Sequence, residues 1–376
     1  MDERTTKNEK KDRNIWLKLV FSINLFMALL LLCCQTAMRI SPEKLWILQP
    51  LSNTFPVLLL INLLFVMFWT SRKSRLAFLS AAVILIGHDK CSQLYRPGLF
   101  KVEVMQPKNA FKVLSYNVRL FDLYNWTGNL ETRASIFKFF KQEQPDILCI
   151  QEYFHDDKGN FQNNDTIKKL INANFGTIKY SITLRKTSHW GLATFSKYPI
   201  LNEGTVFYEA GKSNFCIYSD LDINNKTVRV YNAHFQSNHF KQEEYEFLEY
   251  PDSLESNNNK LKNTKNILRR IKKAAIKRSQ QVDELKLHMA ACPYPIILCG
   301  DFNDTPFSYT YQTLKNDLDD SFIEKGEGFG STYIKLPINF RIDYILHSPN
   351  IQTHSFRVKN GKLSDHYPIQ SWLSIP

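Results

Sequence analysis

The chain has 376 residues, of which 44% are hydrophobic and 22% charged. These values are typical of a globular protein, with room for one large domain or two ordinary ones. The seven cysteines are odd in number and lack metal-ligand spacing, which argues against a disulfide framework and indicates reduced, buried thiols. Lysine and arginine exceed aspartate and glutamate by 12, which favours anionic partners: nucleic acid, phospholipid headgroups or phosphate esters.

Most of the long apolar runs fall before residue 90. Residues 1–14 are polar and mixed in charge, and we expect a disordered cytoplasmic tail. The run 15–38 contains one charge, Lys18, and matches the roughly 20 residues needed to cross a hydrocarbon core. A signal peptide is the alternative, but the apolar region is too long and no clear Ala-x-Ala cleavage site follows. We therefore predict a first membrane span at about 15–38.

Two further spans are predicted at about 45–69 and 74–88, which gives a transmembrane region over 15–88. The second span has tryptophans near both ends, placed like interfacial anchors, although Pro50 and Pro56 could delay its start or kink it. The apolar part of the third span is short, so a re-entrant or interfacial segment is the alternative.

The distribution of lysine and arginine predicts the orientation of these spans. The tail carries five basic residues and the loop after the second span carries three, whereas the loop between the first two spans carries two. This places the N-terminus in the cytoplasm. With three spans the remainder of the chain is extracytoplasmic, and with two it is cytoplasmic. We predict an integral protein of the inner or plasma membrane with an extracytoplasmic C-terminal part.

Residues 89–110, with two prolines and a glycine, are predicted to be a linker to a soluble α/β domain over 111–376. Strand-like runs dominate this domain, with a few helices between them, and several runs end in a polar residue. This pattern favours a sheet-based α/β sandwich with a site along one edge. The expected helices are 130–141 and 258–290, and the expected strands are 112–117, 146–151, 178–184, 192–195, 215–222, 228–235, 295–299, 341–347, 352–358 and 367–373.

A pronounced change of charge occurs within this domain. Residues 243–255 hold six acidic side chains, whereas 260–278 hold nine basic and no acidic ones, along a helical apolar pattern. The basic run could contact an anionic membrane or nucleic acid. A solvated helix face, neutralised by the acidic stretch before it, is the alternative and is slightly favoured.

The run from Leu298 to Pro306 combines a buried strand with a polar turn. The apolar residues 295–299 stop at Gly300, and Asp301 and Asn303 follow. Both offer the oxygen atoms that a hard divalent cation requires. The alternative is an Asx-type turn that caps the next helix, since Asp-Thr-Pro is also a good helix start.

Polar residues also end other strand-like runs in chain order. Each has a structural explanation by itself, such as a capped turn or a satisfied core histidine. Together they supply what metal-assisted phosphoester cleavage requires: carboxylates for a hard cation, histidines for proton transfer and amides for phosphate oxygens. These residues are Asn117, Glu152, His234, Asp301, Asn303, Asp343, Asp365 and His366.

Six short motifs around these residues resemble those of the endonuclease/exonuclease/phosphatase superfamily, to which deoxyribonuclease I, abasic-site endonucleases, sphingomyelinases and inositol-polyphosphate phosphatases belong. The match covers roughly 111–376, in the family's order. It implies a deoxyribonuclease I-like two-layer α/β sandwich, with two packed mixed sheets flanked by helices. The motifs are Leu114–Arg119, Ile150–Glu152, Asn232–Phe235, Gly300–Asn303, Arg341–Tyr344 and Ser364–Pro368.

The resemblance also implies roles for the site residues. Glu152 would be the principal Mg²⁺ ligand, with Asn117 and Asp365 beside it. Asp301 would orient or deprotonate the attacking water, and Asn303 would hold the scissile phosphate. His366 would lie against the phosphate, with Asp343 on its other ring nitrogen. His234 would bind phosphate or protonate the leaving oxygen.

Some positions depart from the pattern or lack an assignment. Arg119 stands where abasic-site endonucleases carry an acid, which weakens a repair-enzyme interpretation. Asp304 is expected to have a loop or helix-capping role. The family has a phosphate-contacting residue between 175 and 190, for which the candidates are Tyr180, Arg185 and His189. On the long helix, Arg278 and Gln281 could face the site, although surface positions are the alternative.

The predicted function is a membrane-anchored, Mg²⁺-dependent phosphodiesterase or endonuclease, with Mn²⁺ as the second candidate metal. Its partners are the membrane and a phosphoester substrate, either nucleic acid or a phospholipid headgroup. The alternatives are a phospholipid or sphingomyelin-type phosphodiesterase, a phosphoinositide-type phosphatase and, in a different class, a non-catalytic membrane adaptor. No protein partner can be inferred from the sequence.

Overall fold

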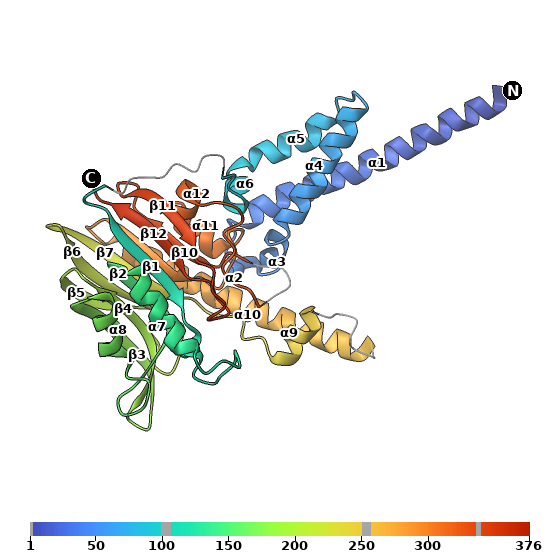
Figure 1. Ribbon diagram of the computed structural model, residues 1–376. Helices are drawn as coiled ribbons and strands as arrows, with labels where there is room; N and C mark the ends of the chain where they lie inside the picture. Colours follow the sequence, from blue (N-terminus) through green and yellow to red (C-terminus); the bar gives the residue numbers. More distant parts are fainter. Residues whose placement is uncertain (1–2, 99–106, 250–256, 336–339) are drawn as a thin grey trace. The chain divides into compact units, whose positions relative to one another are not determined.

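The computed structural model describes residues 3–98, 107–249, 257–335 and 340–376. The chain forms two compact units (Figure 1). Unit 1 comprises Met1–Leu94 with Phe307–Tyr309, and unit 2 comprises Tyr95–Pro306 with Thr310–Pro376. Residues 99–106 of the predicted linker lie outside the described residues. The first residues of the linker, up to Leu94, are helical.

Unit 1 is helical. Helix α1 contains nearly all of the first predicted span, whereas the helices over the second and third predicted spans have other bounds. The segment 45–69 is divided, because Pro56 occupies the first turn of α4, a position that suits proline, and two short helices precede it. Helix α5 has ten residues, about 15 Å at 1.5 Å per residue, which is half of a hydrocarbon core. The helices are α1 (Glu3–Ala37), α2 (Pro42–Leu45), α3 (Leu48–Ser52), α4 (Phe55–Ser71), α5 (Ala77–Ile86) and α6 (His88–Leu94).

Among the described residues, one helical segment, Asn14–Ala37, is both long and apolar enough to cross a membrane. Helix α1 extends beyond it to Glu3, so the expectation of a disordered tail is wrong for the described part. The first glycine or proline of the chain is Pro42, and the tail is rich in lysine and glutamate, which are good helix formers. A helix nucleated in the apolar run therefore propagates toward the N-terminus.

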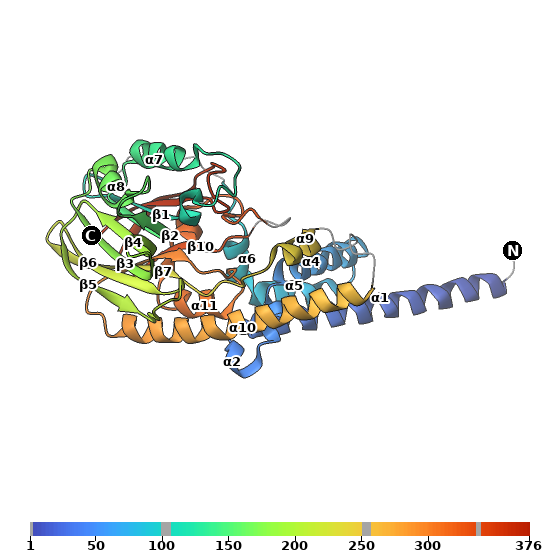
Figure 2. The same ribbon diagram turned by 90° about the horizontal axis from the view of Figure 1, so that it is seen from below.

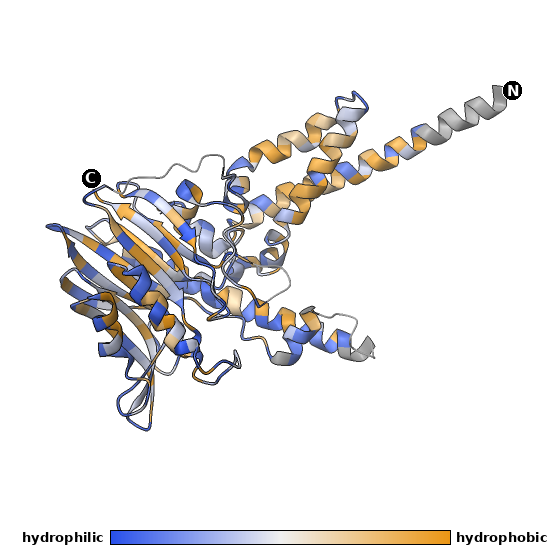
Figure 3. Cartoon of the chain, in the orientation of Figure 1, coloured by the Kyte–Doolittle hydropathy of each residue, from blue (hydrophilic) through white to orange (hydrophobic). Residues whose placement is uncertain are grey.

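Unit 1 buries polar side chains and exposes apolar ones. Asn24 of α1 donates a hydrogen bond to Ser80 of α5 (2.6 Å) and accepts one from Trp69 Nε1 of α4 (2.9 Å). Ser80 donates in turn to Asn62 Oδ1 (2.8 Å), and the three polar residues are fully buried. Large apolar side chains face outward, and the helices are mostly apolar along their length (Figure 3). They include Phe26, Leu29, Leu60, Met67, Phe78 and Leu85, each more than half exposed.

Unit 2 contains two six-stranded mixed sheets packed face to face, which confirms the predicted two-layer sandwich. The first sheet has the order β11-β12-β1-β2-β4-β3 and the second has the order β5-β6-β7-β8-β10-β9. The strands are β1 (Phe111–Asn117), β2 (Ile147–Asp156), β3 (Phe175–Leu184), β4 (Ser188–Ser196), β5 (Ile200–Val206), β6 (Cys216–Ile223), β7 (Lys226–His234), β8 (Ile296–Asp301), β9 (Asp319–Asp320), β10 (Asp343–His347), β11 (Gln352–Val358) and β12 (Ile369–Ser374).

Helices cover the outer faces of this sandwich (Figure 2). Helices α7 and α8 lie on the side of the first sheet, and the long helix α10 runs along the second. Because its outer face is covered as well, β1 is buried almost throughout, which explains why it appears apolar rather than strictly alternating in the sequence. The helices and the 3₁₀ turn of unit 2 are η1 (Arg119–Asp122), α7 (Thr132–Glu143), α8 (Asn163–Ile171), α9 (Gln242–Glu249), α10 (Asn257–Ala290), α11 (Tyr309–Lys315) and α12 (Ser321–Lys325).

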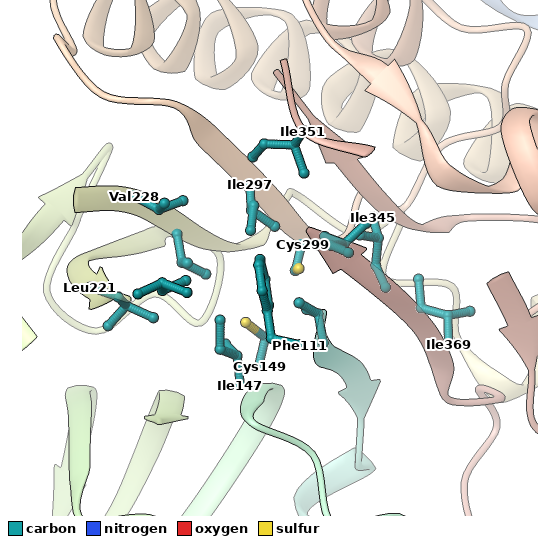
Figure 4. Close-up of a cluster of buried hydrophobic side chains, with 14 of the residues drawn as sticks. Phe111, Ile147, Cys149, Leu221, Val228, Ile297, Cys299, Ile345, Ile351 and Ile369 are labelled. Atoms are coloured by element: carbon teal, nitrogen blue, oxygen red, sulfur yellow. The ribbon is translucent and has the colours of Figure 1, made fainter. Parts of the chain in front are cut away.

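The main core fills the space between the two sheets (Figure 4). Phe111 and Cys149 come from the first sheet, and Ile297, Cys299 and Ile345 from the second, all without solvent exposure. The seven cysteines are free. Cys149 and Cys299 are buried in this core, and Cys216 is buried at the start of β6. This packed core fixes the strands whose ends carry the polar residues described next.

Candidate active site

Strand pairing gathers the predicted polar residues at one end of the sandwich. Strands β1 and β2 are parallel with Asn117 opposite Gln151, so that Glu152 follows beside Asn117. Strands β7 and β8 are also parallel and pair His234 with Asp301. Asp343 begins β10 opposite Asp301 in an antiparallel pair. The ends of these five strands therefore meet, because both sheets are packed on one core.

Gly300 allows the close approach of β7 and β8 at this point. A Cβ at residue 300 would lie 1.9 Å from the carbonyl oxygen of Ala233, a distance that no side chain can tolerate. Only glycine therefore permits the pairing that brings Asp301 next to His234.

Asp301 lies at the centre of the cluster and is 1% exposed. Its Oδ1 accepts a hydrogen bond from the Asn303 backbone N–H (2.8 Å), and its Oδ2 accepts one from Asn117 Nδ2 (3.0 Å). Two histidine nitrogens, Nε2 of His234 and Nε2 of His366, each lie 3.7 Å from Oδ2. Burial raises the pKa of Asp301, and the two histidines act in the opposite direction.

His366 is held by a carboxylate on its other side. Its Nδ1 lies 2.9 Å from Asp343 Oδ2, and both side chains are buried. Burial alone would lower the pKa of His366, but the carboxylates of Asp343 and Asp301 outweigh it and raise the pKa to about 10. The ring therefore has a fixed orientation, with Nε2 directed at Asp301.

His234 has one nitrogen engaged and one without a partner. Nδ1 lies 3.3 Å from the backbone oxygen of Ser213, whereas the buried Nε2 has no hydrogen-bond partner among the described residues. Nε2 is 3.7 Å from Asp301 and 3.9 Å from Glu152 Oε1. A buried polar atom without a hydrogen-bond partner destabilises a fold. Because Nε2 of His234 points toward two carboxylates, we infer that it faces a position for a ligand or a proton.

Glu152 is turned out of its sheet by an irregularity in β2. The register of β2 against β4 shifts between Ile150 and Tyr153, and Glu152 has a φ of 48°. Its side chain remains 32% exposed beside the buried Asp301. Bulges of this kind redirect side chains next to active sites, so the residue predicted to bind metal is the more accessible acid.

Asn117 and Asp365 complete this side of the cluster. Asn117 donates through Nδ2 to Glu152 (3.3 Å), and its oxygen accepts the Arg119 backbone N–H (3.1 Å). In this arrangement the amide nitrogen faces Glu152, and rotation of the amide would present its oxygen instead. Asp365 lies 3.4 Å from Arg119 Nε and is partly exposed.

The loop after β8 places Asn303 beside Asp301. Asn303 adopts a φ of 51°, a left-handed conformation that asparagine tolerates, and its Nδ2 donates to the Phe235 backbone oxygen (3.0 Å). The loop that follows His234 and the loop that carries Asn303 are thus directly connected.

Asp304 lies in a loop, as expected, but its side chain also has a buried partner that the sequence did not indicate. It is buried and forms an ion pair with Arg278 Nε of α10 at 3.0 Å, while Thr310 also donates to it. Burial raises the pKa of Asp304, and Arg278 acts against this. Its side-chain oxygen does accept the neighbouring Thr305 N–H (3.2 Å), but the buried charge pair is the dominant contact.

Arg278 and Gln281 do not reach the reacting groups and are not surface residues either. Arg278 donates to the Gln236 backbone oxygen (2.8 Å), and Gln281 Oε1 accepts the Gln236 N–H (2.9 Å). Through Asp304, Arg278 therefore joins the loop after His234 to the loop that carries Asn303. Both side chains are at most 3% exposed, which shows that one turn of α10 holds the two loops together.

The candidates between 175 and 190 contact residues outside the cluster. Tyr180 stacks on His189 at 4.5 Å, and its OH lies 3.0 Å from Asn164 Nδ2. His189 Nε2 is 3.1 Å from Asp157. Arg185 lies in the turn between β3 and β4 with a φ of 53°. These contacts give no support for a phosphate-binding role.

Two residues of the quoted motifs received no role from the sequence. Gln151 donates to Asn232 Oδ1 at 2.7 Å, a buried hydrogen bond between the two sheets directly behind the site. Each is a polar residue within an apolar strand, immediately before Glu152 or two residues before His234. That position was the available signal, because a polar residue in a buried strand needs a specific partner.

The site therefore has the composition of a phosphoester hydrolase that works with a metal ion and general acid–base groups. One ligand atom each from Asp301, Asp343 and His366 lies within 4.8 Å of the other two, a group that could hold a metal ion. All eight predicted residues lie in this region of unit 2.

Comparison with protein families identifies the class. Residues 114–366 match the Endonuclease/Exonuclease/phosphatase family, so the chain belongs to this family. Its members are hydrolases that act on phosphoester bonds and typically use divalent metal ions, which confirms the predicted enzyme class. Residues 17–93 match a second family, described as a domain of unknown function. No curated protein matches the chain.

Solved structures are similar to this chain at low sequence identity. An endonuclease/exonuclease/phosphatase family protein from Bacteroides thetaiotaomicron has a TM-score of 0.50 and 17% identity, and the match covers 72% of this chain and 97% of that one. The human nocturnin catalytic domain with bound sulfate has a TM-score of 0.49 and 16% identity, and the match covers 75% of this chain and 100% of that one. A family protein from Leptotrichia buccalis has a TM-score of 0.47 and 16% identity, and the match covers 69% of this chain and 98% of that one.

Proposed function

We propose that this protein is a membrane-anchored, Mg²⁺-dependent phosphodiesterase that cleaves by direct attack of water. The observation that carries the proposal is the environment of Asp301. This buried carboxylate has two histidine nitrogens at 3.7 Å, an amide hydrogen bond from Asn117, and Glu152 next to them. A purely structural carboxylate would not need two histidines directed at it.

The residues have distinct proposed roles. Asp301 orients the attacking water and accepts its proton, for which burial and the resulting raised pKa suit it. His234, through its unpartnered Nε2, donates to a phosphate oxygen or to the leaving oxygen. His366, held by Asp343, places positive charge beside the oxygens on which negative charge develops. Asn303 fixes the phosphate.

The carboxylates of Glu152 and Asp365 fit a hard divalent cation, with Asn117 as a third oxygen donor after rotation of its amide. These donors are oxygen atoms without a thiol, which suits Mg²⁺ and, as the second candidate, Mn²⁺. A bound ion would polarise the phosphoryl group and offset its developing charge. The partial exposure of Glu152 leaves room for this.

The inverted polarity of unit 1 supports the membrane anchor. The segment Asn14–Ala37 is only 22% buried within the protein, unlike the core helix of a soluble domain. Apolar surface outside and hydrogen-bonded Asn24, Asn62 and Ser80 inside are typical of helices packed in lipid. We propose spans within 15–88, a cytoplasmic N-terminus and an extracytoplasmic catalytic unit at 111–376.

A phosphodiester of nucleic acid is the first candidate substrate, since the net charge of +12 favours a polyanion. A phospholipid or sphingomyelin-type diester or a phosphoinositide is the second candidate. The exposed apolar surface of unit 1 favours this second candidate, because a membrane anchor would keep the enzyme at a bilayer.

The test uses the full-length protein in detergent micelles with Mg²⁺. Bis(p-nitrophenyl) phosphate, plasmid DNA, sphingomyelin and phosphoinositide micelles are the substrates, with His366→Ala as the inactive reference. We expect hydrolysis of the chromogenic diester and of one natural substrate class. If the folded wild type hydrolyses none of them, the adaptor alternative replaces this proposal.

A further inference from the structure

Two cationic side chains, Arg119 and Lys335, lie beside the site, and none of the roles proposed above uses them. Arg119 Nε is 3.4 Å from Asp365. Burial and the nearby Arg119 lower the pKa of Lys335, while Asp365 and Glu152 oppose this, so these four groups share one neighbourhood. Among the described residues, no carboxylate lies within ion-pair distance of Lys335.

Each of these cations is fixed over an aromatic ring. The Arg119 guanidinium lies 4.4 Å from the centre of Trp126, and Lys335 Nζ lies 4.0 Å from the centre of Tyr245. Such contacts hold a cation in place without neutralising its charge. Lys335 therefore remains able to bind an anion, and Arg119, whose charge Asp365 partly offsets at 3.4 Å, can contribute through the rest of its guanidinium group.

The ring beneath Lys335 is connected to the catalytic histidine. Tyr245 of α9 forms a hydroxyl–hydroxyl hydrogen bond of 3.0 Å with Tyr333, and the Tyr333 ring meets the His366 ring edge-on at 5.0 Å. Lys335 is thus held at a defined position relative to the place where we expect the scissile phosphate.

We propose that Arg119 and Lys335 form a binding site for a second phosphate next to the scissile one, and that the ligand is a nucleic-acid strand. This inference rests on the proposed phosphodiesterase function. Trp126 and Tyr124, which meet edge-on at 5.0 Å and are 45% and 59% exposed, offer aromatic surface to the bases beside that phosphate. A phosphorylated lipid headgroup has the second phosphate but no aromatic ring.

The experiment compares TpT with TpTpT, which carries one more nucleotide and therefore one more phosphate, using full-length protein in detergent micelles and Mg²⁺. A charge-assisted contact to the second phosphate should raise kcat/KM for TpTpT about tenfold over TpT. Lys335→Gln and Arg119→Gln should each reduce the ratio of kcat/KM for TpTpT to kcat/KM for TpT to about 1–2. Lys286→Gln, which removes an exposed cation paired with Asp317, is the matched control and should keep the wild-type ratio.

The ratio separates binding of a second phosphate from a structural role, because misfolding or a general loss of catalysis lowers both substrates together. An unchanged ratio in Lys335→Gln overturns the inference, as does a wild-type ratio near one. Sensitivity to Lys335→Gln with phosphatidylinositol phosphates but not with TpTpT would reassign the site to lipid headgroups. If bis(p-nitrophenyl) phosphate is cleaved while the ratio is one, only this inference fails. If nothing is cleaved, the proposed function fails with it.

Discussion

Replacement of Asp301 by asparagine tests the proposed base with little change of shape. The new amide keeps an oxygen for the Asn303 N–H, now 2.8 Å from Oδ1. Its NH₂ group, however, would face Asn117 Nδ2, which now donates to Oδ2 at 3.0 Å, so the Asn117 amide must rotate to restore a hydrogen bond. The substitution therefore removes the proton acceptor while the fold persists.

Loss of a positioned base typically costs about 10²–10⁴ in rate, which corresponds to about 3–5 kcal/mol in the activation barrier. We expect kcat for bis(p-nitrophenyl) phosphate to fall by that factor in Asp301→Asn, measured by nitrophenolate release from full-length protein at saturating Mg²⁺. Asp317→Asn, which neutralises a carboxylate that is 56% exposed on the same unit, should retain wild-type kcat. A kcat for Asp301→Asn within threefold of wild type, with unchanged thermal unfolding, would refute the role of Asp301.

Three further predictions concern other contacts. Asp343→Asn, which loosens the 2.9 Å contact with His366, should lower kcat by about 10–100-fold; a smaller loss would mean that Asp343 does not orient the ring. Arg278→Met removes the cation that pairs with the buried Asp304 and should destabilise unit 2 by about 3 kcal/mol, seen as an earlier unfolding transition. The double variant with Asp304→Asn should recover part of this stability, and absence of recovery contradicts the pairing. Asn24→Leu should destabilise unit 1 by about 1 kcal/mol in SDS unfolding followed by tryptophan fluorescence, and an unchanged transition would argue against the polar network.

The ends of the strands were predictable because their chemistry is local. Gly300 and Asp301 interrupt an apolar run, and a polar residue at the end of a buried strand must lie at a sheet edge. The order of motifs then predicted that Asn117, Glu152 and His366 would meet, although the residues are far apart in the chain. Register and packing, which no single segment encodes, create the contacts to Asp301.

Other features depend on partners that a sequence does not reveal. The pair Arg278–Asp304 joins two segments whose individual patterns are typical of a basic helix and a helix cap. Tyr245 lies in an acidic run, and its contact with Tyr333 follows from the folding of α9 against the site. In unit 1, Pro56 lies in the first turn of α4, which begins at Phe55, so the predicted segment 45–69 is not one continuous helix.

Metal dependence of hydrolysis is the most direct test of the central claim. Wild type, Glu152→Gln and Asp365→Asn would be assayed as full-length proteins with bis(p-nitrophenyl) phosphate, after removal of metals with EDTA and titration of Mg²⁺. The account predicts no turnover with EDTA, recovery of wild type by Mg²⁺, and a Mg²⁺ requirement raised at least about tenfold in both variants. Hydrolysis that persists in EDTA, or variants with the wild-type Mg²⁺ dependence, would contradict the assignment of Glu152 and Asp365 as the metal site.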